Sequence, residues 1–149
     1  MHQRFAILGV FGFAFMALTG CGGTDTVGAT VPVTGKIELN GTALATGTVT
    51  YLADDTKGNK TQAAIIGPIT NGQYTLHTTG TTINKPGAPP GWYKVVVQTS
   101  APPAADAPKG VLPEAVKIDR KYTDAKLTPL AVEVKKDAPA GHYDLKVTK

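Results

Sequence analysis

The sequence contains one cysteine and one serine among its 149 residues. The single cysteine, Cys21, excludes an internal disulfide framework, so the fold must be held together by its hydrophobic core. The only serine, Ser100, lies in a stretch rich in proline and alanine, with no histidine near it in the sequence. Because no nucleophile is paired with a base, we expect the protein not to be an enzyme.

Charged residues are also scarce, at 17% of the chain against about a quarter in a typical globular protein. The formal net charge is +4, and the basic residues of the second half are interleaved with acidic ones. Nucleic-acid binders usually gather lysine and arginine on one face or stripe. We therefore expect no nucleic-acid partner.

Side chains that bind metals are few and scattered. The histidines after the first residues are His77 and His142, and a metal site usually needs three or four ligands at close spacing. Asp54, Asp55 and Asn59 offer oxygen ligands, but they lack the spacing of a known calcium loop. We expect both histidines at the surface, no metal site and no cofactor.

The first twenty residues follow the order of a secretory signal. A short basic start with Arg4 is followed by an apolar run over 5–18, interrupted only by glycines, and then by small residues. A helix of this run would span only about 21 Å, whereas the hydrocarbon core of a bilayer is about 30 Å thick. We therefore predict that residues 1–20 are a leader that is cleaved.

The end of this leader, Leu18-Thr19-Gly20-Cys21, resembles the lipobox of bacterial lipoproteins. The resemblance implies cleavage between Gly20 and Cys21, a diacylglyceryl thioether on the Cys21 sulfur and an acyl chain such as palmitate on the new amino group. Two acyl chains, at about 0.8 kcal/mol per buried methylene, give stable anchoring. The alternatives are an ordinary signal with an incidental free thiol, and a signal anchor.

Residues 21–30 (CGGTDTVGAT) are small and polar, so we predict a flexible tether before a folded domain that covers 31–149. The predicted location is the cell envelope, on a membrane and facing the periplasm or the cell surface. Gly22 stands where some lipoproteins of the inner membrane carry aspartate, which favours the outer membrane.

From residue 31 onward, apolar residues alternate with polar ones, which indicates short, half-buried strands. Asn40-Gly41 and Asn71-Gly72 predict tight turns, because both residue types tolerate positive φ. With 17 glycines and 11 prolines, the chain disfavours helices. The pattern predicts an all-β fold, a seven-stranded antiparallel sandwich of Greek-key type. We expect strands over 31–39, 48–52, 62–69 (with a break at 67–68), 73–78, 92–98, 130–134 and 143–147.

Two parts of the domain have distinctive compositions. Residues 92–98 are apolar on both faces, which predicts a central strand. Residues 99–129 form a long loop, of which 111–125 is expected either to fold a short helix or to lay Val116, Ile118 and Tyr122 against the sandwich. Such long loops often carry function.

The motifs VTGKIELNGTAL (33–44), GTVTY (47–51) and NGQYTL (71–76) resemble the opening of transthyretin-like domains, above all the carboxypeptidase regulatory-like ones. Residues 89–95 (PPGWYKV) resemble the entry to the next strand of that family. Residues 121–124 (KYTD), with Pro129-Leu130 and 132–135 (VEVK), are similar to the tail of small bacterial lipoproteins that carry this module. The resemblance covers about 31–149 and implies a Greek-key-like sandwich without catalytic machinery.

Related hydrolases use histidines, an arginine and a Tyr-Arg-Gly-Ser tail, whereas this chain ends YDLKVTK and has only Arg120 after the leader. We therefore predict a lipid-anchored structural or protein-interaction module of the cell envelope. The alternative is a module that binds a carbohydrate or another small ligand through loops 80–91 and 99–129. Trp92 and Tyr122 are its candidate contacts, because aromatic rings can form a platform for sugars. The expected partners are a membrane and an envelope protein or glycan.

Overall fold

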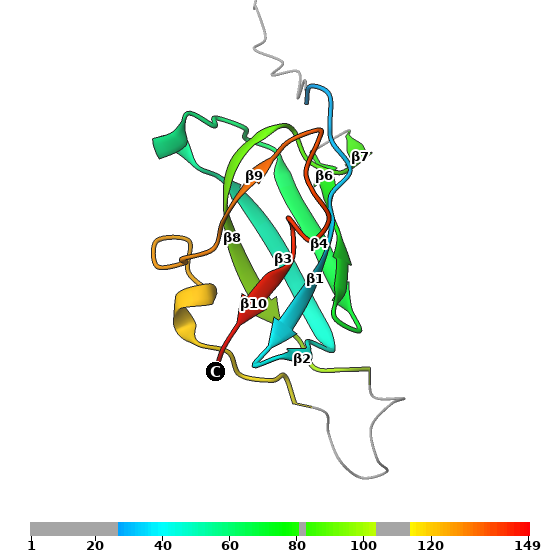
Figure 1. The fold of residues 1–149 in the computed structure, drawn as a ribbon, viewed down its shortest axis with the longest axis vertical. Coiled ribbons are helices and arrows are strands. Elements are labelled where there is room, and N and C mark those ends of the chain that lie inside the picture. The colour runs from blue at the N-terminus through cyan, green and yellow to red at the C-terminus, as the bar shows by residue number, and fades with distance from the viewer. Residues whose placement is uncertain (1–26, 81–82, 104–113) are drawn as a thin grey trace, which may run out of the picture.

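The computed structural model describes residues 27–80, 83–103 and 114–149, which form an all-β domain (Figure 1). This confirms the prediction of an all-β fold. The predicted leader 1–20, the predicted cleavage site Gly20–Cys21 and the first part of the predicted tether lie outside the described residues. In the part of the chain that the structure describes, no helix is long and apolar enough to span a bilayer.

Within the described residues, ten strands form one curled sheet. Its order is β10-β1-β5-β4-β3-β8-β9, and the short strands β2, β6 and β7 pair outside this path. Seven were expected, and the difference arises from short pairings such as β7, which lies in the predicted loop 80–91. The strands are β1 (Thr34–Leu39), β2 (Thr42–Ala43), β3 (Thr46–Ala53), β4 (Ala64–Thr70), β5 (Gln73–Thr75), β6 (His77–Thr79), β7 (Asn84–Pro86), β8 (Gly91–Thr99), β9 (Ala131–Val134) and β10 (Leu145–Val147).

The strand pairs are antiparallel with one exception. β1 and β10 run parallel, with Ile37 opposite Leu145 and Leu39 opposite Val147. Parallel neighbours need a long connection, and here almost the whole domain lies between the two strands. The predicted antiparallel arrangement is therefore wrong for this pair, in which the last strand joins the first at one edge of the sheet (Figure 1).

Both Asn-Gly pairs form the predicted turns. Asn40 and Asn71 have φ of 51° and 50°, and Gly41 and Gly72 have φ of 82° and 73°. Positive φ at both central residues is the requirement of a type I′ hairpin turn.

The predicted break at 67–68 is wrong, because β4 continues through Gly67 and Pro68. Both residues pair with β3, where Pro68 lies opposite Thr48. On its other side β4 faces the interruption between β5 and β6, where the Leu76 amide donates to the Val33 carbonyl 3.0 Å away. A proline is tolerated within a strand where the ladder is interrupted.

The core lies on the concave side of the sheet and follows the predicted alternation. The inward residues of β1, β3, β5 and β8 are almost fully buried, and β8 lies between β3 and β9 as predicted for a central strand. The core residues predicted from the alternation are Val31, Val33, Ile37, Leu39, Val49, Tyr51, Tyr74, Leu76, Tyr93, Val95, Val97, Val132, Val134, Tyr143, Leu145 and Val147.

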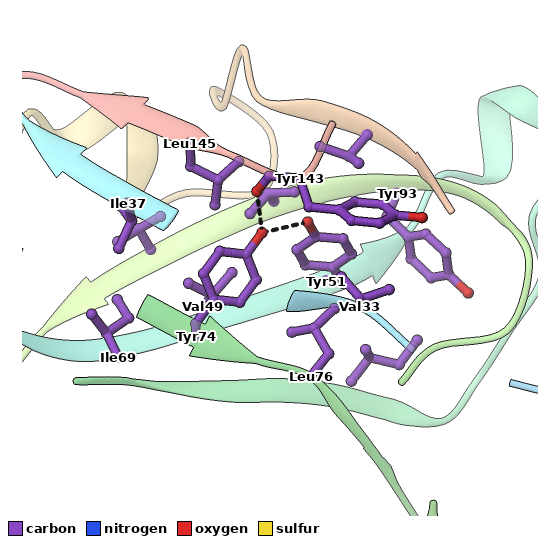
Figure 2. Close-up of a cluster of buried hydrophobic side chains, with 14 of the residues drawn as sticks. Val33, Ile37, Val49, Tyr51, Ile69, Tyr74, Leu76, Tyr93, Tyr143 and Leu145 are labelled. Atoms are coloured by element: carbon purple, nitrogen blue, oxygen red, sulfur yellow. Dashed lines mark hydrogen bonds between the residues drawn. The ribbon is translucent and has the colours of Figure 1, made fainter. Parts of the chain in front are cut away.

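A chain of hydrogen bonds between tyrosines crosses this core (Figure 2). The Tyr74 hydroxyl donates to the Tyr143 carbonyl at 2.5 Å. The Tyr51 hydroxyl lies 2.9 Å from the Tyr74 hydroxyl and must be the donor, because the Tyr74 proton is already used. Burial raises the pKa of both phenols far above the ordinary value, so both stay neutral.

The segment before β10 links the two edges of the curled sheet. The Tyr143 hydroxyl donates to the Lys135 carbonyl at 3.2 Å and lies 3.3 Å from the Lys135 amide, which donates to it. The Asp144 carboxylate accepts from the Lys36 amide of β1 at 2.8 Å. Residues 143 and 144 therefore fasten the end of β9 to β1, the neighbour of the opposite edge strand β10.

The later part of the loop 99–129 packs against the sheet. Residues Arg120–Tyr122 form a short 3-10 helix, η3, whose N-terminal cap is the Asp119 carboxylate. Ile118 and Tyr122 contact the core as expected, whereas Val116 remains 39% exposed. The loop therefore forms a short helix and also packs two of the three expected side chains against the core.

Candidate functional site

The two aromatic residues predicted to contact a ligand have different surroundings. Tyr122 belongs to the hydrophobic core and is only 6% exposed, with its hydroxyl 3.4 Å from the Thr148 hydroxyl. A ring in that position cannot offer a face to a sugar. Trp92 is half-buried at the start of β8 and contacts the β3–β4 connection. That connection and the 3-10 helix η3, which contains Tyr122, lie at opposite ends of the domain, so the structure does not bring the pair together (Figure 1).

The face of Trp92 is covered by a lysine from the same chain. The Lys57 ammonium lies 3.4 Å from the centroid of the indole ring, in the geometry of a cation–π contact. Lys57 is the last residue of a short 3-10 helix, η1 (Asp55–Lys57). A ligand that stacks on this face of Trp92 would first have to displace the ammonium.

The connection that carries Lys57 is ordered by two buried polar side chains. Asp54 is 4% exposed, and its carboxylate accepts from the Thr56 hydroxyl at 2.6 Å and from the Thr56 amide at 3.1 Å. The hydrogen bond from the Thr56 hydroxyl is the main cause that lowers the pKa of Asp54, and the bond from the Thr56 amide adds to it, although burial acts in the opposite direction. Asn59 is 8% exposed and donates to the Trp92 carbonyl at 2.8 Å. The Asp54 side chain therefore orders the connection itself, and the Asn59 side chain holds it against β8.

Replacing Lys57 by alanine is expected to expose Trp92 without unfolding the domain. An exposed cation–π contact contributes only about 0.5–1 kcal/mol. Since Trp92 is the only tryptophan, its fluorescence reports this contact alone. We expect stronger quenching by acrylamide in Lys57→Ala and no change in Lys60→Ala, an exposed lysine of the same connection. Equal quenching in the two variants would contradict the contact.

The two histidines do not converge. His77 is exposed on β6, as predicted. His142 is instead half-buried, with Nε2 2.8 Å from the Glu133 carbonyl oxygen and its ring edge-on to Tyr143. The prediction of two surface histidines is therefore right for His77 only. Within 27–80, 83–103 and 114–149, no three His, Cys, Asp or Glu residues are placed to hold a metal ion.

A shallow depression that the sequence analysis did not predict lies on the outer side of β4, β5 and β6. Its volume is about 470 Å³. Its lining offers hydroxyl, amide and imidazole groups and one proline ring, without a carboxylate, ammonium or guanidinium group. The only sequence signal was the run of uncharged polar residues at outward positions of 73–77. The lining residues are Pro68, Thr70, Asn71, Gln73, Tyr74, Thr75 and His77.

Comparison with known proteins adds no assignment. No protein-family model, curated protein or solved structure matches this chain. The fold defines the class only as far as an all-β domain with a curled, mainly antiparallel sheet.

Proposed function

We propose that the protein is a lipid-anchored lipoprotein of the cell envelope whose domain is a non-catalytic structural or protein-interaction module. The observation that carries this proposal is the position of the only cysteine, Cys21, directly after an apolar leader that ends in small residues. In this proposal the leader is cut before Cys21, and diacylglyceryl and palmitoyl chains hold the new N-terminus in a membrane. With glycine at position 22, the outer membrane is the favoured site.

The start of the described chain supports a short anchor. The Lys85 ammonium on β7 donates to the Val27 carbonyl at 3.0 Å, and Val31 forms a bridge with Ala88. Five residues lie between Cys21 and Val27, so the six steps from one to the other, at about 3.3–3.6 Å each, reach about 20 Å. The end of the domain that carries the β6–β7 hairpin would then lie close to the membrane surface (Figure 1).

For the fold we propose a Greek-key sandwich of the transthyretin-like type, in which the curled sheet closes on itself. The bonds from Tyr143 to Lys135 and from Asp144 to β1 support this arrangement, because they draw the two edges together. Sandwiches of this kind serve widely as accessory and interaction modules, and fold alone does not assign a function. The absence of a described nucleophile–base pair is compatible with a non-catalytic role.

Replacing Cys21 by serine tests the anchor. Without the thiol no thioether can form, so we expect the protein to move from the detergent phase to the aqueous phase in a phase-partition assay. Thr24→Ser, which changes the tether but keeps Cys21, should remain in the detergent phase. Intact-mass analysis of the native protein should give an N-terminal Cys21 with added acyl mass. A native mass that retains residues 1–20, or that lacks acyl groups, would overturn the proposal.

A second candidate function, the binding of a carbohydrate or small ligand, is favoured by one observation. This is the depression lined in part by Gln73, Thr75 and His77, which has no carboxylate, ammonium or guanidinium group in its lining. The platform first expected from Trp92 and Tyr122 does not support it, because one ring is buried and the other is covered by Lys57.

A further inference from the structure

The outward side of the central strands is almost free of charge. We call this surface the outer face and define it by the outward residues of β3, β4, β5, β6 and β8, which alternate with the core residues. Among these described positions Lys94 is the only charged residue. Small proteins normally intersperse charges of both signs over their surface. A broad uncharged area is therefore unusual and is typical of a surface that contacts something else.

Strand register places hydroxyl and amide side chains in rows across this outer face. Gln73 lies opposite Thr70, which lies opposite Thr46 on β3. In the next row Thr48 lies between Pro68 and Gln98. Neighbouring strands are about 4.8 Å apart and outward residues of one strand about 7 Å apart, so these two rows form a small grid of donors and acceptors. Farther along the same strands the outer face carries the exposed side chains of Ile66 and Leu52.

The depression is located in this grid. Thr70, Gln73, Thr75 and His77 on its lining are exposed side chains, and Pro68 adds an apolar ring. Hydroxyl and amide groups both donate and accept hydrogen bonds, which matches the hydroxyl groups of a sugar. The volume of about 470 Å³ lies within the range of small-molecule sites.

The lining also discriminates against other ligands. Nucleic acids and acidic polymers are bound mainly by lysine and arginine, and the lining contains neither. The centres of protein interfaces are rich in exposed aromatic residues, methionine and arginine, whereas the one aromatic ring here, Tyr74, is 1% exposed. Apolar small molecules prefer apolar walls. A neutral polyhydroxylated ligand fits the remaining chemistry.

We propose that this depression binds a neutral polysaccharide through its hydroxyl and amide groups, with the proline ring against the apolar side of a sugar. The inference rests on the second candidate function, the binding of a carbohydrate or small ligand, and names its ligand class, a neutral glycan of the envelope. The binding chemistry itself does not need the lipid anchor. A failure of Cys21 lipidation and a failure of glycan binding are therefore separate results.

The test uses the purified full-length protein on an array of neutral and acidic glycans. We expect binding to neutral glycans and none to uronic-acid or phosphate-bearing ones. Thr75→Lys places a charge in the depression and should weaken binding by about tenfold or more. Gln73→Ala removes one amide without adding charge and should also weaken it. Thr42→Lys, on the exposed strand β2 outside the outer face, is the matched control and should bind as the native protein does.

Three results would overturn the inference. The first is an array without neutral-glycan binding, and the second is equal loss in Thr75→Lys and Thr42→Lys. The third is dimerisation of the native protein in sedimentation experiments that Thr75→Lys abolishes, because the outer face would then be covered by a second copy. Melting temperatures of all variants, measured in parallel, separate lost binding from lost folding.

Discussion

Replacing Gly35 by alanine is expected to destabilise the domain by about 3 kcal/mol, at the upper end of the cost of overpacking a core. Gly35 is an inward position of β1, between Val33 and Ile37, and lies opposite Tyr74 on β5. A Cβ atom there would overlap the Tyr143 carbonyl oxygen and approach the Tyr74 hydroxyl to 2.8 Å. Both neighbours are held by other bonds, so the added methyl group has no room.

The same substitution at Gly28 is the matched control. A Cβ atom at Gly28 meets nothing within 4 Å, and its backbone does not have the positive φ that would strain an alanine. Urea denaturation should therefore give a lower midpoint for Gly35→Ala and an unchanged one for Gly28→Ala, with similar slopes. An unchanged Gly35→Ala midpoint would show that Tyr143 and β1 are farther apart than the structure places them.

Gly35 also shows how far the sequence alone could predict the fold. The alternation of Val33, Ile37 and Leu39 predicted a strand and its inward side, because a period of two is a local property. A glycine within such a strand signals a close approach of another part of the chain. The sequence does not identify that part, since Tyr143 is more than a hundred residues away.

Other parts of the fold show the same difference between local features, which the sequence predicts, and long-range contacts, which it does not. The Asn-Gly turns could be predicted because the required positive φ depends on the turn residues themselves. The parallel pairing of β1 with β10 could not, because it depends on how the whole chain closes. β4 continues through Pro68 for a similar reason: the interruption beside it arises from the Leu76 amide, which donates to Val33 of another strand.

The candidate site was harder to predict than the fold. The sequence predicts Trp92 and Tyr122 as ligand contacts because aromatic residues bind sugars. Whether their rings are exposed depends on the tertiary structure, which the sequence pattern does not show. Tyr122 is buried because Ile118 and η3 pack with it on the core. The depression is made of common polar residues, and only strand register assembles them into one surface. Sequence reasoning finds distinctive residue types more readily than ordinary ones that become adjacent through pairing.

The second large effect is expected for Tyr74→Phe, because one hydroxyl serves two buried partners. Its removal leaves the Tyr143 carbonyl without its donor and the Tyr51 hydroxyl without its acceptor. Each unsatisfied buried group costs about 1–3 kcal/mol, so we expect a loss of about 2 kcal/mol or more in the free energy of unfolding. Tyr93→Phe is the control, because its hydroxyl has one partner, the Pro89 carbonyl, in a partly buried position.

A double-mutant cycle distinguishes a bonded pair from two tyrosines that contribute independently. In Tyr51→Phe alone, the Tyr74 hydroxyl keeps its bond to Tyr143 and loses only a donor, so the cost should be smaller than in Tyr74→Phe. When both hydroxyls are removed, the Tyr51 position has no polar group left to satisfy. The double variant should therefore be less destabilised than the sum of the single variants. Additive losses would mean that the two hydroxyls are not bonded, and that the link from β3 through β5 to the closing segment at Tyr143 is not continuous.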